Sequence, residues 1–351
     1  MIITRTPFRV SFFGGGTDYP TWYQEHGGAV LSTTIDKYCY LTCRYLPPFF
    51  DYKSQIMWSK IEQVISHDDI KHPAVRACLN FVGMHDGVAI HHDGDLPARA
   101  GLGSSSAFTV GLLNALYALQ GKMAGKEALA REAIHVERDL LGEAVGDQDQ
   151  IAAAYGGINR IEIRTDGKFT VKPVILRGER LTALQDHLIL FFTGLVRNAS
   201  EIAEAKIKSL KDKERELRAM RAMVDQAVDL LVDGADIAEF GRLLHESWML
   251  KRSLSEVIAP GFVDDIYTRA RRAGAIGGKL LGAGGGGFML FCVAPERRSE
   301  LLRELDKLVA VPVVFDTAGS QVIFYDAELP APQPLVSRRW LRETVDVSGN
   351  R

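Results

Sequence analysis

The sequence predicts an α+β protein of two domains, and two observations support this prediction. The first is length, because 351 residues suit one large domain or two of ordinary size. The second is that short runs rich in β-branched and aromatic residues alternate with amphipathic stretches of helical period in both halves of the chain. We expect domains at residues 1–185 and 186–330, followed by an extended, proline-containing tail at 331–351.

The N-terminal half is expected to combine a mixed sheet with packed helices. Strands are recognised there by β-branched and aromatic residues, and helices by apolar side chains three and four positions apart. The predicted strands are 2–13 (interrupted by Pro7), 28–44, one or two within 52–62, 87–92, 158–163 and 169–174. The predicted helices are 74–84, 108–119, 126–140 and 151–155.

The C-terminal half is expected to form a second α+β layer. Opposite charges are interspersed at residues 206–221, which indicates a solvated helix face rather than an arm that binds nucleic acid. The predicted helices are 199–232, 237–254, 263–273 and 298–309. The predicted strands are 187–192, 288–293, 313–315 and 321–325, with a strand or loop at 275–281.

The composition is that of an ordinary globular chain, with 46% hydrophobic and 25% charged residues. A net charge of −2 does not indicate binding to nucleic acid or to an anionic membrane. No apolar run in the sequence has membrane-spanning length. The start of the chain shows no signal-peptide pattern, and the four cysteines make no CxxC pair. We therefore expect a cytoplasmic protein with reduced thiols, no nucleic-acid partner and no membrane partner. Homodimer formation is left open.

The most informative stretch is residues 96–107, a loop of small residues that leads into the helix predicted at 108–119. Gly101 and Gly103 allow backbone conformations closed to residues with a Cβ, and they allow a ligand to come close. The serines at 104–106 lie at the cap and first turn of the helix, where N–H groups lack intrahelical partners and the dipole is positive. This pattern favours phosphate binding, with a serine hydroxyl available to Mg²⁺. The alternative is an ordinary serine N-cap after a glycine turn.

Two further glycine clusters, at 14–18 and 282–287, make the phosphate interpretation more specific. Together, segments 7–18, 97–107 and 279–288 resemble the motifs of the GHMP kinase superfamily, which includes galactokinase, homoserine kinase and mevalonate kinase. They occur in the family's order and at family-like separations. The resemblance implies a two-domain fold with an N-terminal mixed α/β domain, a C-terminal ferredoxin-like layer and an active site in the cleft between them.

The resemblance also implies a kinase that uses ATP and Mg²⁺. Ser105 would ligate Mg²⁺ together with Glu137, which lies upstream of an Asp149-Gln150 pair like that of the galactokinase branch. For Glu137, the alternative is a solvated charge on a helix. The residues implied to enclose the ATP phosphates are Ala100, Gly101, Leu102, Gly103, Ser104, Ser105 and Ser106.

Catalysis is assigned, again by resemblance, to Asp149 and Arg9. Asp149 would accept the proton of the acceptor hydroxyl. Arg9 would lie beside it, keeping Asp149 ionised and stabilising charge on the transferred phosphoryl group. Asp147 competes for the role of Asp149, and its alternative is a cap on the helix that follows.

The first and third glycine clusters are expected to hold the acceptor. In sugar-kinase relatives the aspartate of the first motif holds substrate hydroxyls, whereas the alternative for Asp18 is to stabilise a turn. Galactokinases carry Glu-His where this chain has Gly15-Gly16, which argues against galactose and indicates a roomier pocket. The predicted residues are Gly15, Gly16, Thr17, Asp18, Gly284, Gly285 and Gly286.

Within the superfamily, residues 13–18 and 147–150 look most like the bacterial D-glycero-D-manno-heptose 7-phosphate kinases. Members of that branch phosphorylate the anomeric hydroxyl and supply nucleotide-activated heptose for surface polysaccharides. An acceptor that already carries phosphate needs fixed cations, and we assign this role to Arg197 and Lys251. Lys279 is a weaker candidate, which we expect to be a surface charge.

Other classes of function stay as alternatives. The GxGxxG spacing within 282–287 also fits a dinucleotide-binding turn, but a strand-like segment follows where that fold needs a helix. A catalytically silent sugar sensor is disfavoured because the chain retains Arg9, Glu137 and Asp149. A decarboxylase that consumes ATP, and a kinase for fucose, galactose or another unphosphorylated sugar, are the remaining alternatives.

Overall fold

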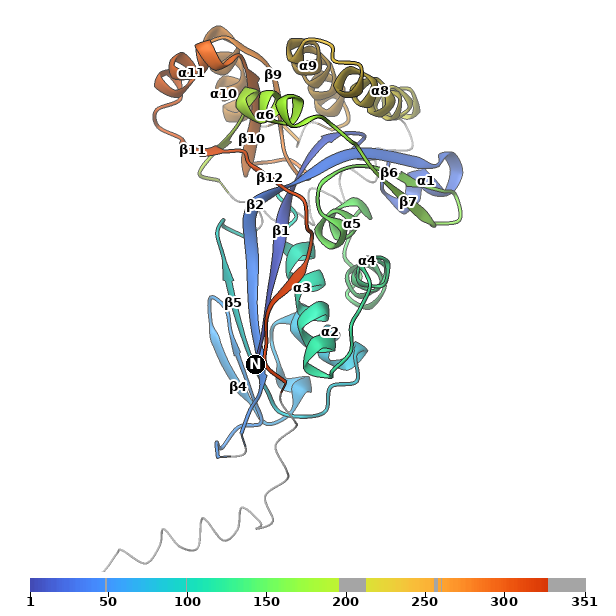
Figure 1. The fold of residues 1–351 in the computed structure, drawn as a ribbon, viewed down its shortest axis with the longest axis vertical. Helices are drawn as coiled ribbons and strands as arrows, with labels where there is room; N and C mark the ends of the chain where they lie inside the picture. The colour runs from blue at the N-terminus through green and yellow to red at the C-terminus, as the bar shows by residue number, and fades with distance from the viewer. Residues whose placement is uncertain (48, 99, 196–212, 256–257, 260, 328–351) are drawn as a thin grey trace, which may run out of the picture.

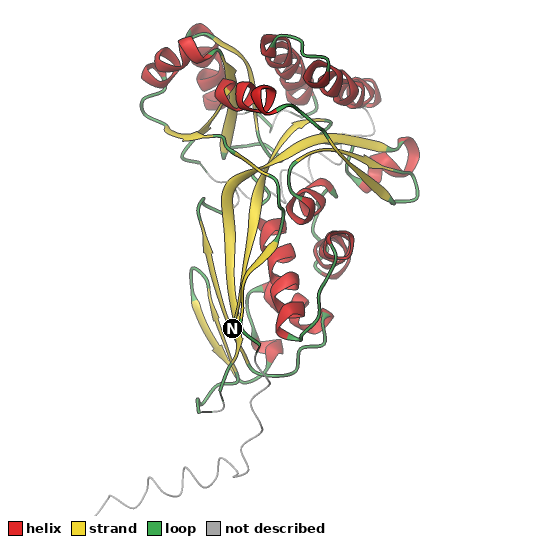
Figure 2. Ribbon diagram, viewed as in Figure 1, coloured by secondary structure: helices red, strands yellow, loops and turns green. Residues whose placement is uncertain are grey.

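The computed structural model describes residues 1–351 except 48, 99, 196–212, 256–257, 260 and 328–351. The described chain forms two sheets that follow one another along the long axis of the molecule (Figure 1). The larger sheet carries helices α2, α3, α4 and α5 on one side, whereas α6, α9, α10 and α11 belong to the part around the smaller sheet (Figures 1 and 2). Helix α8 packs against α9 and against β1 and β2. The predicted α+β fold of two parts is confirmed.

The larger sheet, as far as the chain is described, contains nine strands. Its main path runs β13-β1-β2-β5-β3-β4; β12 and β6 also pair with β2, and β7 pairs with β6. The β3–β5 pair is parallel, and the other described pairs are antiparallel. The strands are β1 (Ile2–Phe13), β2 (Gly28–Tyr45), β3 (Ser54–Met57), β4 (Ile61–Val64), β5 (Val88–Gly94), β6 (Ile158–Ile163), β7 (Phe169–Pro173), β12 (Phe315–Asp316) and β13 (Gln321–Tyr325).

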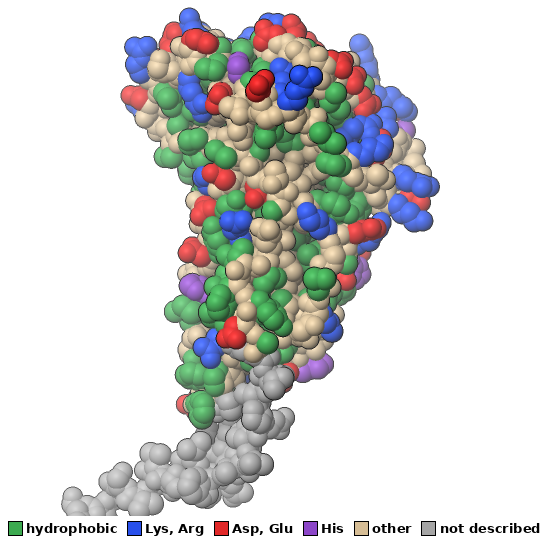
Figure 3. Space-filling model, in the orientation of Figure 1, with side chains coloured by type: hydrophobic (Ala, Val, Ile, Leu, Met, Phe, Trp, Pro, Cys, Tyr) green, Lys and Arg blue, Asp and Glu red, His purple; other side chains and the backbone are tan. Residues whose placement is uncertain are grey.

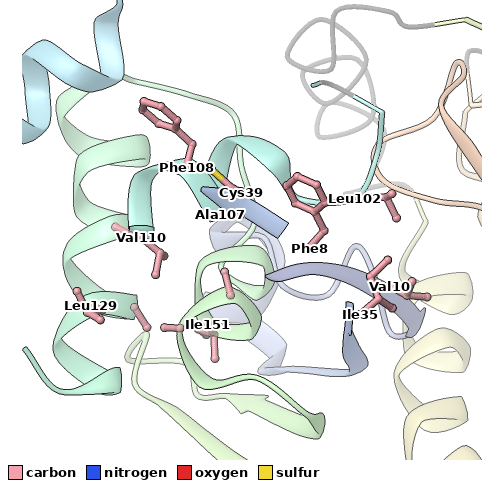
Figure 4. Packing of buried hydrophobic residues seen from close by; sticks show 14 of the residues in the cluster. Phe8, Val10, Ile35, Cys39, Leu102, Ala107, Phe108, Val110, Leu129 and Ile151 are labelled. Carbon is pink, nitrogen blue, oxygen red and sulfur yellow. The ribbon is translucent and has the colours of Figure 1, made fainter. Parts of the chain in front are cut away.

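The core of this part lies between the sheet and α3 (Ser104–Leu119), which is buried on nearly all sides. Gly111 lets the helix approach β1 closely, because a Cβ there would lie 2.7 Å from the Thr6 hydroxyl. The Thr4 hydroxyl also donates to the Gly111 carbonyl at 3.0 Å. Figure 4 shows Phe8 and Val10 of β1 in one apolar cluster with residues of α3. This packing fixes the start of α3 relative to the end of β1.

Four more helices belong to the N-terminal part. The helix predicted at 126–140 forms as α4 only to Ile134, and residues His135–Leu140 continue it as a π-helical turn. Such wider turns are rare and often occur at functional sites. The helices are α1 (Pro20–His26), α2 (Pro73–Phe81), α4 (Lys126–Ile134) and α5 (Gln148–Tyr155).

The smaller sheet has strand order β11-β8-β10-β9, with every described pair antiparallel. Helices follow β8 and β10 in the chain, so the order of elements and strands is that of a ferredoxin-like layer, as predicted. The strands are β8 (Leu188–Phe192), β9 (Ala275–Leu280), β10 (Phe288–Val293) and β11 (Val309–Pro312). The helices are α6 (Gly178–His187), α8 (Glu214–Val232), α9 (Ile237–Ser253), α10 (Gly261–Arg272) and α11 (Arg298–Glu304).

The predicted element and domain bounds differ from the structure in several places. The strands β12 and β13 pair with β2 and β1, so residues 315–325 join the N-terminal sheet rather than the domain predicted at 186–330. Helix α6 was not predicted, and the helix predicted at 298–309 ends at Glu304 before strand β11 begins. The tail at 331–351 and the first part of the helix predicted at 199–232 lie outside the described residues.

The surface and thiols agree with the composition. All four cysteines are free and buried. Among the helices in the described part of the chain, none combines the length and apolar character needed to cross a bilayer. On the face shown in Figure 3, charged side chains are densest over the C-terminal part, and uncharged ones cover much of the middle.

Candidate active site

The centre of the site is a paired arginine and aspartate. Arg9 lies in the buried second half of β1, and Asp149 lies in the first turn of α5. Arg9 Nε donates to Asp149 Oδ1 at 2.7 Å, and Arg9 Nη2 donates to Asp149 Oδ2 at 2.6 Å. Two parallel, charge-assisted bonds orient both side chains. The exposed fraction is 4% for Arg9 and 25% for Asp149, so the carboxylate is the member that a ligand can reach. The structure thus brings the two predicted catalytic residues together.

The same arginine holds the predicted phosphate loop, residues 100–106. Its third nitrogen, Nη1, donates to the Gly101 carbonyl at 2.7 Å, and its backbone N–H donates to the Leu102 carbonyl at 3.0 Å. Gly103 is the N-cap of α3 and adopts a left-handed conformation, with φ 72°. The cap is therefore glycine, and the predicted serine cap is wrong. Ser104, Ser105 and Ser106 form the first helical turn, where backbone N–H groups lack intrahelical partners and are available to an anion.

The third glycine cluster packs directly against the phosphate loop. A Cβ on Gly101 would lie 2.7 Å from the Leu281 carbonyl oxygen, and a Cβ on Gly282 would lie 2.5 Å from the Gly101 Cα. The Ala100 carbonyl accepts from the N–H of Phe288 at 3.1 Å. Glycine is thus required here by contact between two loops of the protein, besides any need for access by a ligand.

The rest of this cluster is held from the C-terminal side. The Gly285 N–H donates to the Ile258 carbonyl at 3.0 Å, and the Gly287 N–H donates to the Leu195 carbonyl at 2.8 Å. Gly284 and Gly286 have positive φ values of 129° and 154°, with Ile258 and Leu195 close behind them. The loop that contains Gly284, Gly285 and Gly286 therefore forms a wall next to the phosphate loop, and its proposed contact with substrate stays a prediction.

Lys251 supports this wall. It lies on α9 with 4% exposure, and its Nζ donates to the carbonyls of Leu280 at 2.8 Å and Gly282 at 2.7 Å. Two of its bonds are thus made to the loop, and the assignment of Lys251 to the sugar phosphate stays a prediction. Arg197, the other assigned cation, lies outside the described residues.

Lys279 is also buried, at 2% exposure, so the expected surface charge is wrong. Its Nζ donates to the Phe12 carbonyl at 2.7 Å and thereby ties β9 to the end of β1. No sequence signal pointed to this, because a lysine between glycine and leucine gives no sign of burial.

The polar side chains of the first glycine turn, residues 14–18, make hydrogen bonds to the backbone of the turn and of β2. The Thr17 hydroxyl is fully buried and lies within hydrogen-bond distance of the carbonyls of Gly14 (2.8 Å) and Ala29 (2.9 Å), so it holds the turn, and contact of Thr17 with substrate stays a prediction. Asp18 Oδ1 accepts from the Gly16 N–H at 2.7 Å, so the turn-stabilising alternative for Asp18 is realised in this structure. Gly15 is half-buried. Contact of Gly15, Gly16 and Asp18 with a sugar stays a prediction.

Asp147 has a position and partners that differ from those of Asp149. It is 2% exposed, and its Oδ1 accepts from Arg138 Nη1 at 3.1 Å. Burial raises its pKa to about 6, in spite of the nearby Arg138. Asp147 stands at the N-cap of α5 without a side-chain cap bond, and its N–H donates to the Asp18 carbonyl at 3.0 Å. It therefore connects α5 to the first glycine turn, whereas Asp149 faces Arg9.

Glu137 lies in the π-helical turn and is completely buried, so the alternative of a solvated helix charge is wrong. Its Oε2 accepts from Ser106 Oγ at 2.9 Å and from Gln150 Nε2 at 2.5 Å. Burial is the main reason that its pKa rises to about 7. The hydroxyl described against Glu137 is that of Ser106. Ser105 is exposed on the same turn and its metal role stays a prediction. Sequence reasoning noted Gln150 as part of the Asp149-Gln150 pair but assigned it no role.

These residues fit a magnesium ion held jointly with nucleotide phosphates. Glu137 Oε1 is buried and has no hydrogen-bond partner within the described chain, which leaves one carboxylate oxygen for a cation. No three His, Cys, Asp or Glu side chains among the described residues gather closely enough to hold a metal alone. Mg²⁺ commonly takes one or two carboxylates together with substrate phosphates and waters, so a single acid beside an anion loop matches its needs.

Comparison with known proteins identifies the family. The model of the GHMP kinases N terminal domain matches residues 70–157, and the model of the GHMP kinases C terminal domain matches residues 213–310. The chain therefore belongs to the GHMP kinases. It is an ATP-dependent phosphotransferase, and Mg²⁺ is the usual metal of this family.

Individual relatives agree with this assignment. A D-glycero-alpha-D-manno-heptose 7-phosphate kinase from Campylobacter jejuni is 32% identical over 330 residues, which cover 87% of this chain and 93% of that protein. A bifunctional fucokinase/GDP-fucose pyrophosphorylase from Arabidopsis thaliana is 26% identical over 85% of this chain, which spans 30% of that longer protein. The crystal structure of a D-glycero-D-manno-heptose 1-phosphate kinase from Bacteriodes thetaiotaomicron has the same fold, with a TM-score of 0.75 and 24% identity over 93% of this chain and 100% of that one.

Proposed function

We propose that this kinase transfers the γ-phosphoryl group of ATP to the anomeric hydroxyl of D-glycero-D-manno-heptose 7-phosphate, which yields the 1,7-bisphosphate. The observation that carries the chemistry is the Arg9–Asp149 pair beside the phosphate loop. The choice of acceptor is supported by the 32% identity to the heptose 7-phosphate kinase over most of both chains. A kinase for an unphosphorylated sugar is the second candidate, supported by the similarity to the fucokinase.

In this proposal Asp149 orients the acceptor hydroxyl and accepts its proton. The sugar oxygen forms its bond to the γ-phosphorus, the bond from that phosphorus to the bridging oxygen breaks, and ADP leaves. Arg9 keeps the carboxylate in place with two bonds and brings a positive charge near the phosphoryl oxygens. Phosphoryl transfer depends mainly on such positioning and charge stabilisation, since the protein performs little covalent chemistry.

The nucleotide is placed by the loop 100–106 and the N–H groups of the first turn of α3. Glu137 and Ser105 would hold Mg²⁺, while the Ser106 hydroxyl donates to Glu137. The ion supplies positive charge that offsets the phosphate oxygens when it is bound. The adjacent loop 281–287 excludes water from one side of the phosphates, because Lys251, Ile258 and Leu195 hold it there.

The acceptor is proposed to lie between the first glycine turn and Asp149, within reach of Gly15, Gly16 and Asp18. Arg197 remains the proposed cation for the phosphate already on the sugar. The product would supply nucleotide-activated heptose for surface polysaccharides, and we place the reaction in the cytoplasm, where ATP is available. Homodimer formation stays a prediction.

The test is ATP consumption with a panel of acceptors: the heptose 7-phosphate, the same heptose without phosphate, mannose 6-phosphate, fucose and galactose. We expect turnover with the heptose 7-phosphate and much less with the unphosphorylated heptose. Turnover with fucose alone would instead select the second candidate. No turnover with any acceptor would favour a non-catalytic sugar sensor.

The Arg197→Ala variant tests the proposed phosphate contact. We expect its KM for the sugar phosphate to rise by about 10-fold or more, because a charge-assisted bond is lost, while its KM for ATP stays the same. Equal changes in both KM values would remove Arg197 from the acceptor site. The unphosphorylated heptose is the matched control, since its weaker turnover should not respond to the substitution.

A further inference from the structure

The carboxylate of Glu137 is held in an asymmetric way. Its Oε2 accepts two hydrogen bonds, one from the Ser106 hydroxyl at 2.9 Å and one from the Gln150 side-chain amide at 2.5 Å. Its Oε1 is buried and accepts no hydrogen bond from the described residues. The Thr109 hydroxyl donates to the Ser105 carbonyl at 3.2 Å, but it lies near enough to the carboxylate to oppose the rise in the pKa of Glu137. Both donors to Oε2 are neutral groups. They therefore orient the Glu137 carboxylate but do not neutralise its negative charge. A buried carboxylate oxygen without a donor is unfavourable unless a cation approaches it.

The Gln150 side-chain amide is itself buried and has few hydrogen-bond partners. Gln150 is completely buried, and its Oε1 has no hydrogen-bond partner among the described residues, so the Nε2–Glu137 bond is the one described contact of this amide. A buried glutamine whose side-chain oxygen accepts no hydrogen bond is costly in stability. This cost is explained if the amide has a task in the site rather than in the core.

Helix α5 places this amide next to the catalytic pair. Consecutive residues on a helix point about 100° apart, so the first turn of α5 directs Asp149 to Arg9 and Gln150 to Glu137. The Ser106 hydroxyl reaches Glu137 from the turn that begins α3, at the phosphate loop. The position of Glu137 therefore depends on both the helix that carries the base and the helix that receives the nucleotide.

We propose that Gln150 is a positioning residue for the metal site. Together with Ser106 it holds Glu137 Oε2, which fixes the rotation of the carboxylate and presents Oε1 to the Mg²⁺ that accompanies ATP. Partners that orient a ligand in this way typically change metal affinity by about 10- to 100-fold when they are lost. The inference rests on the proposed role of Glu137 as a metal ligand, and it adds a role for Gln150 that the family motif alone does not define.

The experiment measures metal binding directly, with Mn²⁺ as a paramagnetic probe and a non-hydrolysable ATP analogue, by electron paramagnetic resonance titration of the whole protein. We expect Gln150→Met to weaken Mn²⁺ binding in the ternary complex by about 10-fold or more. Gln148→Met is the matched control, because Gln148 is a buried glutamine of the same helical turn that makes no described contact with Glu137. Binding in the Gln148→Met variant should equal that of the wild type.

Two further variants separate the possible failures. Glu137→Gln should weaken Mn²⁺ binding at least as strongly as Gln150→Met; if it binds like the wild type, the role of Glu137 is wrong. If Glu137→Gln is weak but Gln150→Met is normal, the positioning role of Gln150 is wrong. Where Gln150→Met does not fold, Gln150→Asn decides the outcome, because it keeps the buried amide but shortens its reach to Glu137 Oε2 and should weaken Mn²⁺ binding several-fold.

A kinetic readout distinguishes positioning from general damage. For Gln150→Met, the apparent KM for Mg²⁺ at fixed ATP should rise by about 10-fold, while the KM for the sugar acceptor stays unchanged. A parallel rise in both values would indicate a structural defect and would overturn the proposal.

Discussion

The two carboxylates that we propose to act in this kinase are held in opposite ways. Asp149 is partly exposed and shares both oxygens with the guanidinium of Arg9. Glu137 is completely buried, and its two described bonds come from the neutral groups of Ser106 and Gln150. One carboxylate therefore has its counter-charge built into the protein, whereas the other is surrounded by groups that direct it without neutralising it.

This difference indicates how the site divides its tasks. A carboxylate paired with arginine keeps a defined direction before any ligand arrives, as a base that must meet a hydroxyl requires. A buried carboxylate with an unoccupied lone-pair position gains most when a cation enters with the nucleotide. The protein thus orients the proposed base in advance, whereas the proposed metal ligand is completed only when the nucleotide brings its cation.

The largest effect is expected from Asp149→Asn, which tests the first half of this comparison. The variant keeps the shape and some hydrogen bonding to Arg9 but cannot accept the proton, so kcat should fall by about 10²- to 10⁴-fold. ATP binding, measured by isothermal titration calorimetry, should remain close to that of the wild type. A fall in kcat of less than about threefold would remove Asp149 as the base.

A smaller effect is expected from Arg9→Lys, which keeps the positive charge but removes the planar guanidinium group with its several N–H donors. Lysine cannot supply two parallel bonds to Asp149 and a third to the Gly101 carbonyl, so kcat should fall by about 10- to 100-fold. Steady-state kinetics measures this, and thermal unfolding is the control for the fold. Activity equal to the wild type would mean that positive charge alone suffices and that the geometry of the pair is irrelevant.

The smallest effect is expected on the free energy of unfolding, and it concerns Glu137, the buried carboxylate. In metal-free protein the pKa of Glu137 is raised from 4.5 to about 7 by burial, so between these values the native state binds more protons than the unfolded state. The associated stability is complete below about pH 4.5 and is lost as the pH rises to about 7. The free energy of unfolding should therefore decrease by about 3 kcal/mol as the pH rises through this interval, because the two pKa values differ by about 2.5.

Urea denaturation at several pH values, in the presence of a chelator, measures this decrease. In Glu137→Gln the pH dependence should be flatter over the same interval. Asp147, whose pKa burial raises to about 6, adds a contribution of the same sign and accounts for what remains. An unchanged pH dependence in Glu137→Gln would show that its burial is not coupled to protonation.

Sequence reasoning reached the fold class and the Arg9–Asp149 pair because both depend on motifs with local chemical meaning. Glycine next to serine at the start of a helix predicts an anion site wherever it occurs, and the three motifs together indicated the family. The pairing of Arg9 with Asp149 came through that family resemblance, because 140 residues separate them in the chain.

What sequence reasoning missed depends on packing between distant segments. The burial of Lys279 follows from a contact between β9 and the end of β1, which no local pattern records. The contact of Ser106 with Glu137 depends on helical phase and on the π-helical turn, since a regular helix from 126 to 140 would direct Glu137 differently. Lys251 lies beside the third glycine cluster and carries the positive charge that a phosphate site needs. Its two described hydrogen bonds, however, are to backbone carbonyls of that loop.

The return of β13 to the first sheet has a consequence for synthesis of the protein. Strand β1 pairs with β13, and the amino group of Met1 donates to the Asp326 carbonyl at 2.8 Å. About 300 residues separate β1 from β13, so at ribosomal rates one side of β1 waits on the order of 15–60 s for its partner. An open strand edge of this kind invites association with other chains. A ribosome that stops before residue 321 would therefore release a chain that contains every residue of the proposed site but still exposes the edge of its first strand.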